Sequence, residues 1–169
     1  MEEIEQILEY LSQRGDYVVW AGYAQFAYVG IQPSPDIDIY TDSEETLHLI
    51  SRDFQEKGWQ VTHQPKKISA LWDKLEKNGV TFDIIYTEPS QLFFRDRTKL
   101  EINGYSVFCL SKEALFLTKM GALTSKGRIE DKKQRDLEAI LKLRGIIDPE
   151  KVAEIAQKLP ASYWKIGWV

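Results

Sequence analysis

The segment from Asp36 to Tyr40, DIDIY, alternates aspartate with isoleucine and ends in tyrosine. Because successive side chains of a β-strand point to opposite faces, this alternation predicts a strand with one polar and one apolar face. We expect Ile37 and Ile39 to face a hydrophobic core. Asp36 and Asp38 then lie side by side on the opposite face.

The residues before this strand predict three further elements. Tyr17 to Trp20 (YVVW) is short, β-branched and aromatic, which is typical of a buried strand, and Trp20 is expected to be buried in it. Tyr23 to Val29 predicts a short helix that ends at Gly30. Two prolines within Gln32 to Pro35 exclude a helix and a central strand, so this stretch is a loop. The order is strand, glycine, short helix, turn and strand.

In the rest of the chain, predicted helices and strands follow one another, and the last three predicted elements are helices. One segment, 68–78, is ambiguous, because Leu71 and Leu75 fit a helix whereas Asn78-Gly79 is a hairpin signal. Helices are predicted from Ile4 to near Gly15, from Ser43 to about Lys57, from Ser111 to about Leu123, from Asp131 to about Leu143 and from Asp148-Pro149 to Leu159; strands are predicted at 59–63, 80–86, 100–102 and 105–109.

This order predicts an α+β fold, a mixed β-sheet with flanking helices and a helical C-terminal region. Residues 1–110 are expected to form the α/β core, and residues 111–169 a helical region packed on it, as a single compact unit. Trp164 and Trp168 lie in an amphipathic tail that we expect to dock on the domain.

Composition limits the classes of function. The single cysteine, Cys109, cannot form an internal disulfide, and one cysteine with two histidines argues against a zinc site. A net charge of −4 argues against nucleic-acid binding by bulk electrostatics. The acidic start MEEIEQILEY is not a signal peptide, and no apolar run is long enough for a membrane span. We therefore expect a cytoplasmic protein that has no membrane partner.

Asp36 and Asp38 predict a divalent-metal site. Two carboxylates this close repel each other unless a cation lies between them, and Mg²⁺ (or Mn²⁺) prefers such hard oxygen ligands. Asp83 stands alone in the apolar strand VTFDIIY (80–86) and extends the site if that strand lies beside DIDIY. It is then also a candidate general base. The alternatives are a solvated face for the Asp-x-Asp pair and an edge strand whose single charge, Asp83, points outward.

Gly22 adds a second signal, since it lies at the start of the short helix. The N-terminus of a helix offers backbone N–H groups to phosphates, and glycine lets a ligand approach closely. A phosphate cradle and a metal site are thus predicted about 15 residues apart, in the order strand, helix, strand.

The stretch from Val18 to Tyr40, VVWAGYAQFAYVGIQPSPDIDIY, resembles the signature of the nucleotidyltransferase (polymerase β-like) superfamily, with Asp83 as its third carboxylate. The stretch from Lys119 to Leu143, KMGALTSKGRIEDKKQRDLEAILKL, is similar to a segment of minimal nucleotidyltransferases of the AbiEii-type toxin group. Its counterpart residues are Lys119, Arg128, Lys132 or Lys133, and Asp136.

The resemblance implies Mg²⁺-dependent transfer of a nucleoside monophosphate from an NTP, such as ATP, to an acceptor. The acceptor stays open between an RNA 3′ end, a protein hydroxyl and a small molecule. The implied roles are catalysis and metal binding for Asp36, Asp38 and Asp83, and nucleotide binding for Gly22, Tyr23, Ser34, Lys119, Arg128 and Lys133.

Two departures from the family pattern keep an alternative open. Tyr23 stands where relatives usually have Gly or Ser, and Gln32 stands near a usual Arg. Both favour a catalytically silent nucleotidyltransferase-like module that acts on a cognate partner, as in a toxin–antitoxin pair. A metal-dependent phosphohydrolase is a third reading, although a hydrolase does not need a triphosphate cradle.

Overall fold

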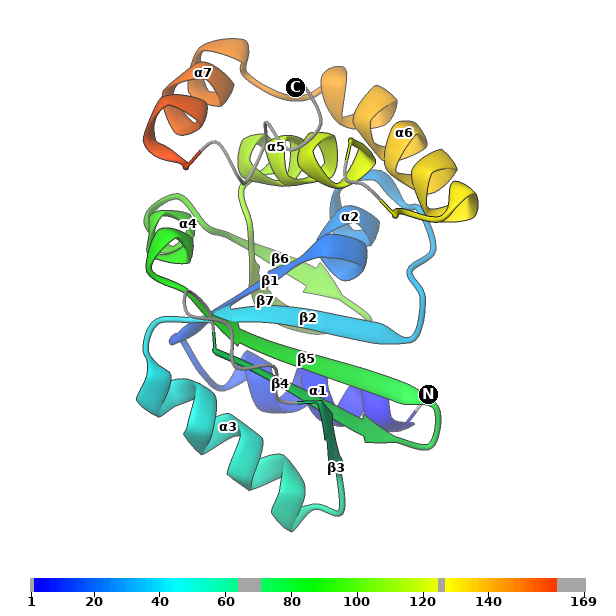
Figure 1. Cartoon of the computed structure of the whole chain (residues 1–169), viewed down its shortest axis with the longest axis vertical. Coiled ribbons are helices and arrows are strands. Elements are labelled where there is room, and N and C mark those ends of the chain that lie inside the picture. Colours follow the sequence, from blue (N-terminus) through cyan, green and yellow to red (C-terminus); the bar gives the residue numbers. More distant parts are fainter. Residues whose placement is uncertain (1, 64–70, 125–126, 161–169) are drawn as a thin grey trace.

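Seven strands form one mixed sheet in the part of the chain that the computed structural model describes, residues 2–63, 71–124 and 127–160. Their order across the sheet is β3-β4-β5-β2-β1-β7-β6 (Figure 1). The strands are β1 (Tyr17–Trp20), β2 (Asp36–Thr41), β3 (Gln60–His63), β4 (Leu71–Lys77), β5 (Val80–Tyr86), β6 (Thr98–Ile102) and β7 (Tyr105–Cys109). The predicted α+β fold with a mixed sheet is confirmed.

The centre of this sheet is the strand with the alternating sequence, β2. It pairs with β1 in the antiparallel direction and with β5 in the parallel direction. The next strand, β4, pairs antiparallel with β5, and β3 closes that edge. On the other side β1 runs parallel to β7, which forms a hairpin with β6. Asp83 therefore does not lie on an edge strand.

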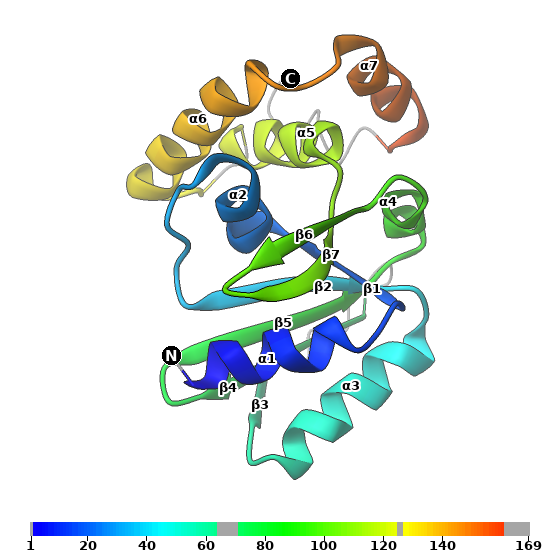
Figure 2. The same ribbon diagram turned by 180° about the vertical axis from the view of Figure 1, so that it is seen from behind.

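The helices lie in two layers on opposite sides of the sheet (Figures 1 and 2). The first layer, α1 and α3, packs against the face formed by β2, β4, β5 and β7. In the second layer α5 contacts α2, α6 and α7. The helices are α1 (Glu2–Ser12), α2 (Ala21–Val29), α3 (Glu44–Glu56), α4 (Leu92–Arg95), α5 (Lys112–Leu123), α6 (Glu130–Arg144) and α7 (Pro149–Lys158).

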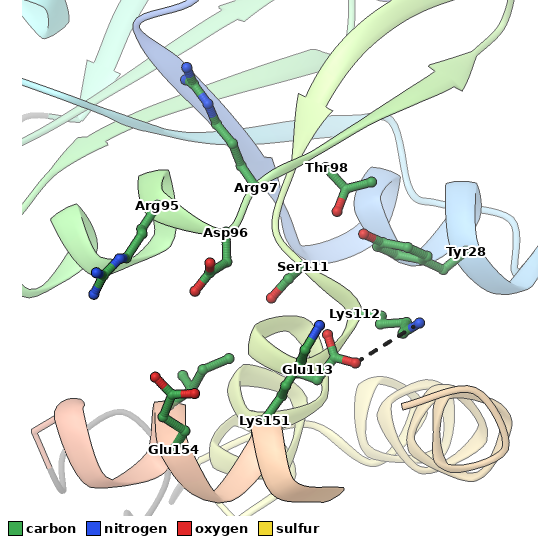
Figure 3. Close-up of a pocket in the computed structure, with 11 residues that line it drawn as sticks. Tyr28, Arg95, Asp96, Arg97, Thr98, Ser111, Lys112, Glu113, Lys151 and Glu154 are labelled. Carbon is green, nitrogen blue, oxygen red and sulfur yellow. Dashed lines mark ion pairs between the residues drawn. The ribbon is translucent and has the colours of Figure 1, made fainter. Parts of the chain in front are cut away.

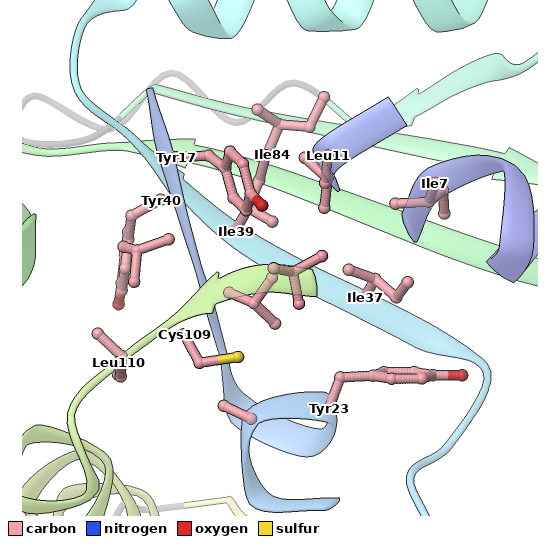
Figure 4. Close-up of a cluster of buried hydrophobic side chains, with 14 of the residues drawn as sticks. Ile7, Leu11, Tyr17, Tyr23, Ile37, Ile39, Tyr40, Ile84, Cys109 and Leu110 are labelled. Atoms are coloured by element: carbon pink, nitrogen blue, oxygen red, sulfur yellow. The ribbon is translucent and has the colours of Figure 1, made fainter. Parts of the chain in front are cut away.

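The main core lies between the sheet and the layer of α1 and α3. Ile37 and Ile39 are fully buried there, as their alternation predicted. They lie beside Phe82 and Ile84 of β5, which point to the same face. Figure 4 shows Ile37, Ile39 and Ile84 gathered with side chains of α1 and of the neighbouring strands. Because this face is apolar and covered, the alternate residues of β2 and β5 must point to the other face.

The ambiguous segment resolves as a hairpin. Residues 71–77 form β4, and Asn78 and Gly79, both at positive φ (50° and 78°), make the turn to β5. Two consecutive positive φ values suit the right-handed twist of a two-residue hairpin, which an Asn-Gly pair adopts readily. Leu71 and Leu75, four residues apart, share one face of a strand as well as of a helix. Their spacing therefore does not discriminate between the two structures.

Several element boundaries differ from the predictions by one or two residues; α1, for example, starts at Glu2 instead of Ile4, and β6 at Thr98 instead of Leu100. The short helix starts at Ala21 instead of Tyr23, and the short helix α4, which follows a 3₁₀ turn at Glu88–Gln91, was not predicted. Ser43 caps α3 as expected, because its hydroxyl accepts a hydrogen bond from the Thr46 amide at 3.1 Å. The shifts involve one or two residues and α4 is about one turn long, and periodicity is weak over so few residues.

Two further predictions concern the helical C-terminal region, and one concerns membrane spans. The division into an α/β core (1–110) and a helical region (111–169) stays a prediction, although α5 to α7 do lie together on one side of the sheet. Trp164 and Trp168 lie outside the described residues, as does Lys126. Among the described helices none is both long and apolar enough to cross a membrane.

The core prediction concerns Phe54 of α3, which is fully buried and packs edge to face against Tyr10, Trp59 and Phe82 at centroid distances of 5.0, 5.5 and 4.9 Å. Replacing it with alanine leaves a cavity among these rings, so Phe54→Ala should lower the free energy of unfolding by about 3–5 kcal/mol. Urea unfolding measures this change. The matched control is Leu49→Ala on the exposed side of α3, which should cost about 0.5 kcal/mol or less. Equal losses for the two variants would contradict this packing.

Candidate active site

One row of side chains crosses four strands on the face of the sheet opposite to α1 and α3. The strand registers place Trp20 of β1 opposite Asp38 of β2, Asp38 opposite Asp83 of β5, and Asp83 opposite Lys74 of β4. Neighbouring strands lie about 4.8 Å apart. The two carboxylates at the centre of the row are thus held side by side, with an indole at one end and an ammonium group at the other.

A cleft of about 520 Å³ opens above this row. Its floor is the sheet, and its opposite wall comes from α5 and from the start of α6 together with Arg128. Asp36, two residues before Asp38, lies on the same strand face. The charged residues that line the cleft are Asp36, Asp38 and Asp83 on the sheet, and Lys74, Lys119, Arg128 and Lys132 around them.

The carboxylates crowd one another in this cleft. Burial raises the pKa of Asp38 well above its ordinary value, and the negative charges of Asp83 and then Asp36 add to the increase, while Lys119 and Lys132 offset part of it. Within the described residues the Asp36 Oδ1 atom is buried without a hydrogen-bond partner. An orphaned carboxylate oxygen next to a crowded one favours a cation as the missing partner.

The third carboxylate has a neighbour of its own. The Trp72 indole N–H donates a hydrogen bond to the Asp83 Oδ1 atom at 2.6 Å. Among the described residues no three His, Cys, Asp or Glu side chains converge closely enough to hold a metal ion. The structure thus brings Asp36, Asp38 and Asp83 to one patch of the sheet, as predicted, but it does not gather all three around a single point.

The turn from β1 into α2 forms one end of the cleft. Trp20 is the N-cap residue of α2 and makes no side-chain cap hydrogen bond, so the first amides of this helix have no side-chain cap. Ala21, at φ 55°, takes the left-handed conformation that glycine normally adopts. Gly22 lines the cleft, and a Cβ atom added there would meet Pro33 at an ordinary contact distance of 3.4 Å. The backbone strain of this turn is therefore at Ala21, between β1 and α2.

Lys119, Arg128 and Lys132 form a cationic wall of the cleft, and a buried ion cluster holds two of these side chains in place. Asp136 of α6, 1% exposed, lies between Lys119 of α5 (3.1 Å from Nζ to Oδ1) and Arg128 (2.8 Å from Nε to Oδ2). The carboxylate of α6 thus fixes one cation from α5 and one from the loop before α6 at the edge of the cleft. Lys132, one turn before Asp136, is exposed and also lines the cleft.

The predicted nucleotide-binding residues separate into two groups. Gly22, Lys119 and Arg128 line the cleft, and Ser34 lines a small side pocket that also includes Gln32. Tyr23 instead is buried in the hydrophobic cluster, 7% exposed, where burial and the nearby Asp36 raise the pKa of its hydroxyl (Figure 4).

Lys133 is the other residue that the structure places away from the cleft. Its ammonium group lies 3.9 Å from Glu130 on the same helix. Of the two candidates at this position, Lys132 lines the cleft and Lys133 does not. Adjacent helical residues point about 100° apart, so only one of the two can face the cleft.

Three aromatic or charged residues that line the cleft, Trp20, Trp72 and Lys74, were not predicted as site residues from the sequence. Trp20 is half-buried, not fully buried as expected, and stacks on Tyr40 at 4.8 Å. Trp72 and Lys74 lie in the segment whose structure was ambiguous. Had the Asn78-Gly79 turn been taken as decisive, counting outward from Lys77 and Val80 would have paired Lys74 with Asp83.

A second cavity, of about 560 Å³, lies near the other end of α5 (Figure 3). Its lining includes Arg95, Asp96, Lys112, Lys151 and Glu154, which come from α4 and the residue after it, α5 and α7. The Asp-x-Asp strand does not reach it. Its charges of both signs are mostly exposed, which is typical of a solvated surface.

Comparison with solved structures shows a fold likeness. The chain is similar to an antigenic nucleotidyltransferase-like protein from Paracoccidioides brasiliensis, with a TM-score of 0.58 and 18% identity over 98% of this chain and 93% of that one. It is also similar to the lincomycin-bound lincosamide antibiotic adenylyltransferase LnuA, with a TM-score of 0.58 and 19% identity over 86% of this chain and 97% of that one. Neither a protein-family model nor a curated protein matches the sequence. The chain thus has a nucleotidyltransferase-like fold.

Proposed function

We propose that the chain is a Mg²⁺-dependent nucleotidyltransferase that moves a nucleoside monophosphate from an NTP to a hydroxyl group of an acceptor. The single observation that supports it best is the cleft itself. A strained, uncapped helix start and a fixed cationic wall face carboxylates on two adjacent strands of one sheet. Phosphates and a divalent cation are the ligands that these two kinds of surface bind together.

The triphosphate is assigned to the end of the cleft near α2. Backbone N–H groups at the start of α2 and the positive end of its dipole favour phosphate oxygens. Lys119 and Arg128 are held at the same end by Asp136, and Lys132 is close enough to Asp38 to lower its pKa. Cations fixed in advance at the leaving phosphates stabilise the charge that develops during transfer.

Asp36 and Asp38 are the residues that would hold the metal. Mg²⁺ commonly takes one or two protein carboxylates and completes its coordination with substrate phosphates and water. A pair of carboxylates on β2, one with an orphaned oxygen, fits that requirement without a third protein ligand. When bound, Mg²⁺ supplies positive charge that neutralises the phosphates and relieves the repulsion around Asp38.

Asp83 is assigned the role of general base for the acceptor hydroxyl group. Trp72 fixes one oxygen of its carboxylate and thereby its orientation. In the transfer, the acceptor hydroxyl oxygen attacks the α-phosphorus while the bond from that phosphorus to the β-phosphate oxygen breaks. The hydroxyl proton passes to Asp83, and pyrophosphate leaves toward the cationic wall.

The placement of Tyr23 supports an enzyme over a silent module. Bulk at Tyr23 was the main reason to doubt triphosphate binding, but its ring lies in the hydrophobic cluster and does not line the cleft. Gly22, next to it, lines the cleft and carries no side chain. The departure from the usual Gly or Ser therefore leaves room for phosphates.

The first prediction tests the activity. Asp38→Asn removes a central carboxylate and should reduce transfer of label from α-³²P-NTP, with Mg²⁺ and a cell extract as the source of acceptors, by at least about 100-fold. Glu101→Gln, an exposed carboxylate on β6, is the matched control and should transfer label like the unaltered chain. Transfer that persists in Asp38→Asn, in a preparation free of other transferases, would rule out this mechanism.

The second prediction concerns stability without metal. Because the folded chain holds the Asp38 proton more tightly than the unfolded chain, stability should fall as pH rises from the ordinary aspartate pKa through the raised one. In EDTA, Asp38→Asn should therefore raise Tm by a few degrees at pH 7 and flatten this pH dependence. Mg²⁺ with an NTP should raise the Tm of the unaltered chain and not that of the variant. A variant less stable than the unaltered chain in EDTA would contradict the carboxylate crowding.

The third prediction concerns the ion cluster. Asp136→Asn leaves the buried Lys119 and the half-buried Arg128 without a counter-charge, so the free energy of unfolding should fall by about 3 kcal/mol. Affinity for an NTP should fall as well, because the two cations are no longer fixed. Urea unfolding and calorimetry measure the two effects. Asp131→Asn, an exposed aspartate on the same helix, should change neither.

A further inference from the structure

Two residues of β4 occupy the side of the cleft that the nucleotide-binding groups leave open. Trp72 and Lys74 lie two residues apart on one strand, so both face the cleft, about 7 Å apart at 3.4 Å per residue. Trp72 pairs in register with Ile85, and Lys74 with Asp83. An aromatic ring and an ammonium group thus flank the carboxylate assigned to the acceptor hydroxyl.

The geometry of phosphoryl transfer determines which molecule meets these residues. The attacking oxygen and the leaving oxygen lie on opposite sides of the phosphorus. Lys119 and Arg128 share a side pocket with Gly22 at the start of α2, whereas β5 and β4 continue the sheet from β2 on the side away from β1. If pyrophosphate leaves toward the cations, the acceptor approaches from above β5 and β4, over Asp83, Trp72 and Lys74.

Lys74 differs from Lys119 and Arg128, across the cleft, in having no fixed counter-charge. Lys119 and Arg128 both end on Asp136, whereas the Lys74 ammonium makes no ion pair with the described residues. Lys74 is nevertheless half-buried. Its cross-strand neighbour Asp83 is committed to the acceptor proton, and Glu76, the next residue on this face, is exposed and does not line the cleft. A partly buried ammonium group without a partner favours an anionic ligand.

We propose that Trp72 and Lys74 form an acceptor subsite for a phosphate-bearing molecule with a flat ring, of the chemistry of a nucleoside monophosphate. The ring lies on the Trp72 indole, the phosphate binds the Lys74 ammonium, and a sugar hydroxyl faces Asp83. This inference rests on the proposed nucleotidyl transfer. It goes beyond it by assigning an anionic acceptor, because a polycationic hydroxyl compound such as an aminoglycoside is repelled by Lys74.

The test uses two acceptor probes that differ only in the phosphate group, adenosine and AMP. The full chain is saturated with Mg²⁺ and with whichever α,β-methylene NTP analogue binds, so that the donor site is filled, and each probe is then titrated by calorimetry. AMP should bind about tenfold more tightly than adenosine, the gain expected from a hydrogen bond to a charged group. Kanamycin, a polycationic probe, should bind more weakly than either.

Variants of β4 test which side chain causes AMP to bind more tightly than adenosine. Lys74→Gln should reduce the affinity for AMP to that for adenosine and leave the affinity for the NTP analogue unchanged. Lys77→Gln removes the same charge from the exposed end of the strand, outside the cleft, and should keep the tenfold preference. Trp72→Leu should weaken AMP and adenosine to the same degree, since both present the same ring to the indole.

The failures of the two proposals are distinguishable. Equal affinities for AMP and adenosine, a preference for kanamycin, or an AMP preference that survives Lys74→Gln would each overturn the acceptor subsite while donor binding stands. If none of the four NTP analogues binds in the presence of Mg²⁺, the proposed function fails, and the acceptor subsite fails with it.

Discussion

The parallel pairing of β2 with β5 places two carboxylates directly opposite each other, Asp38 against Asp83. Like charges opposite each other on neighbouring strands are destabilising. Burial raises the pKa of Asp38, and the negative charge of Asp83 raises it further. Asp36, on the same strand face, adds to it. The rest of the structure either compensates for this repulsion or makes use of it.

Compensation comes from the opposite face of the same two strands. Ile37 pairs with Phe82, and Ile39 with Ile84, and all four are fully buried under α1 and α3. Because the side chains of a strand alternate, the register that buries these four residues also sets the aspartates side by side. A slip by one residue would bury the carboxylates and expose the isoleucines. The hydrophobic core thus determines the geometry of the polar face.

The aspartates on the polar face share a cleft with cations that come from outside the sheet. The row from Trp20 through Asp38 and Asp83 to Lys74 gives the cleft a direction, with the helix start and the cationic wall at one side and β4 at the other. The buried Asp136 neutralises part of that wall and fixes it in place. Under the proposed transfer, a donor with several phosphates would bind beside the cationic wall and an acceptor with one phosphate beside β4. The fold itself, which this chain shares with nucleotidyltransferase-like proteins, does not select the acceptor.

Much of this site was accessible from local sequence. Alternation in DIDIY predicted which residues face the core, and the Gly-helix-loop context predicted Gly22 at a helix start, because both patterns depend on residues within a few positions of each other. The Asn78-Gly79 turn carried enough information to pair Lys74 with Asp83, but the competing helical spacing of Leu71 and Leu75 obscured it.

Tertiary structure decided what no local pattern contains. The parallel contact of β2 with β5 joins Asp38 to Asp83 across a crossover of some forty residues, and nothing near either residue specifies the other. The choice of Lys132 over Lys133 depends on how α6 is rotated by its packing, and the removal of Tyr23 from the cleft depends on a hydrophobic cluster assembled from distant elements. The sequence by itself thus determined which face of β2 is polar and, to within about two residues, where the longer helices begin. Long-range packing decided which polar groups meet, because the burial that fixes each register involves residues far apart in the chain.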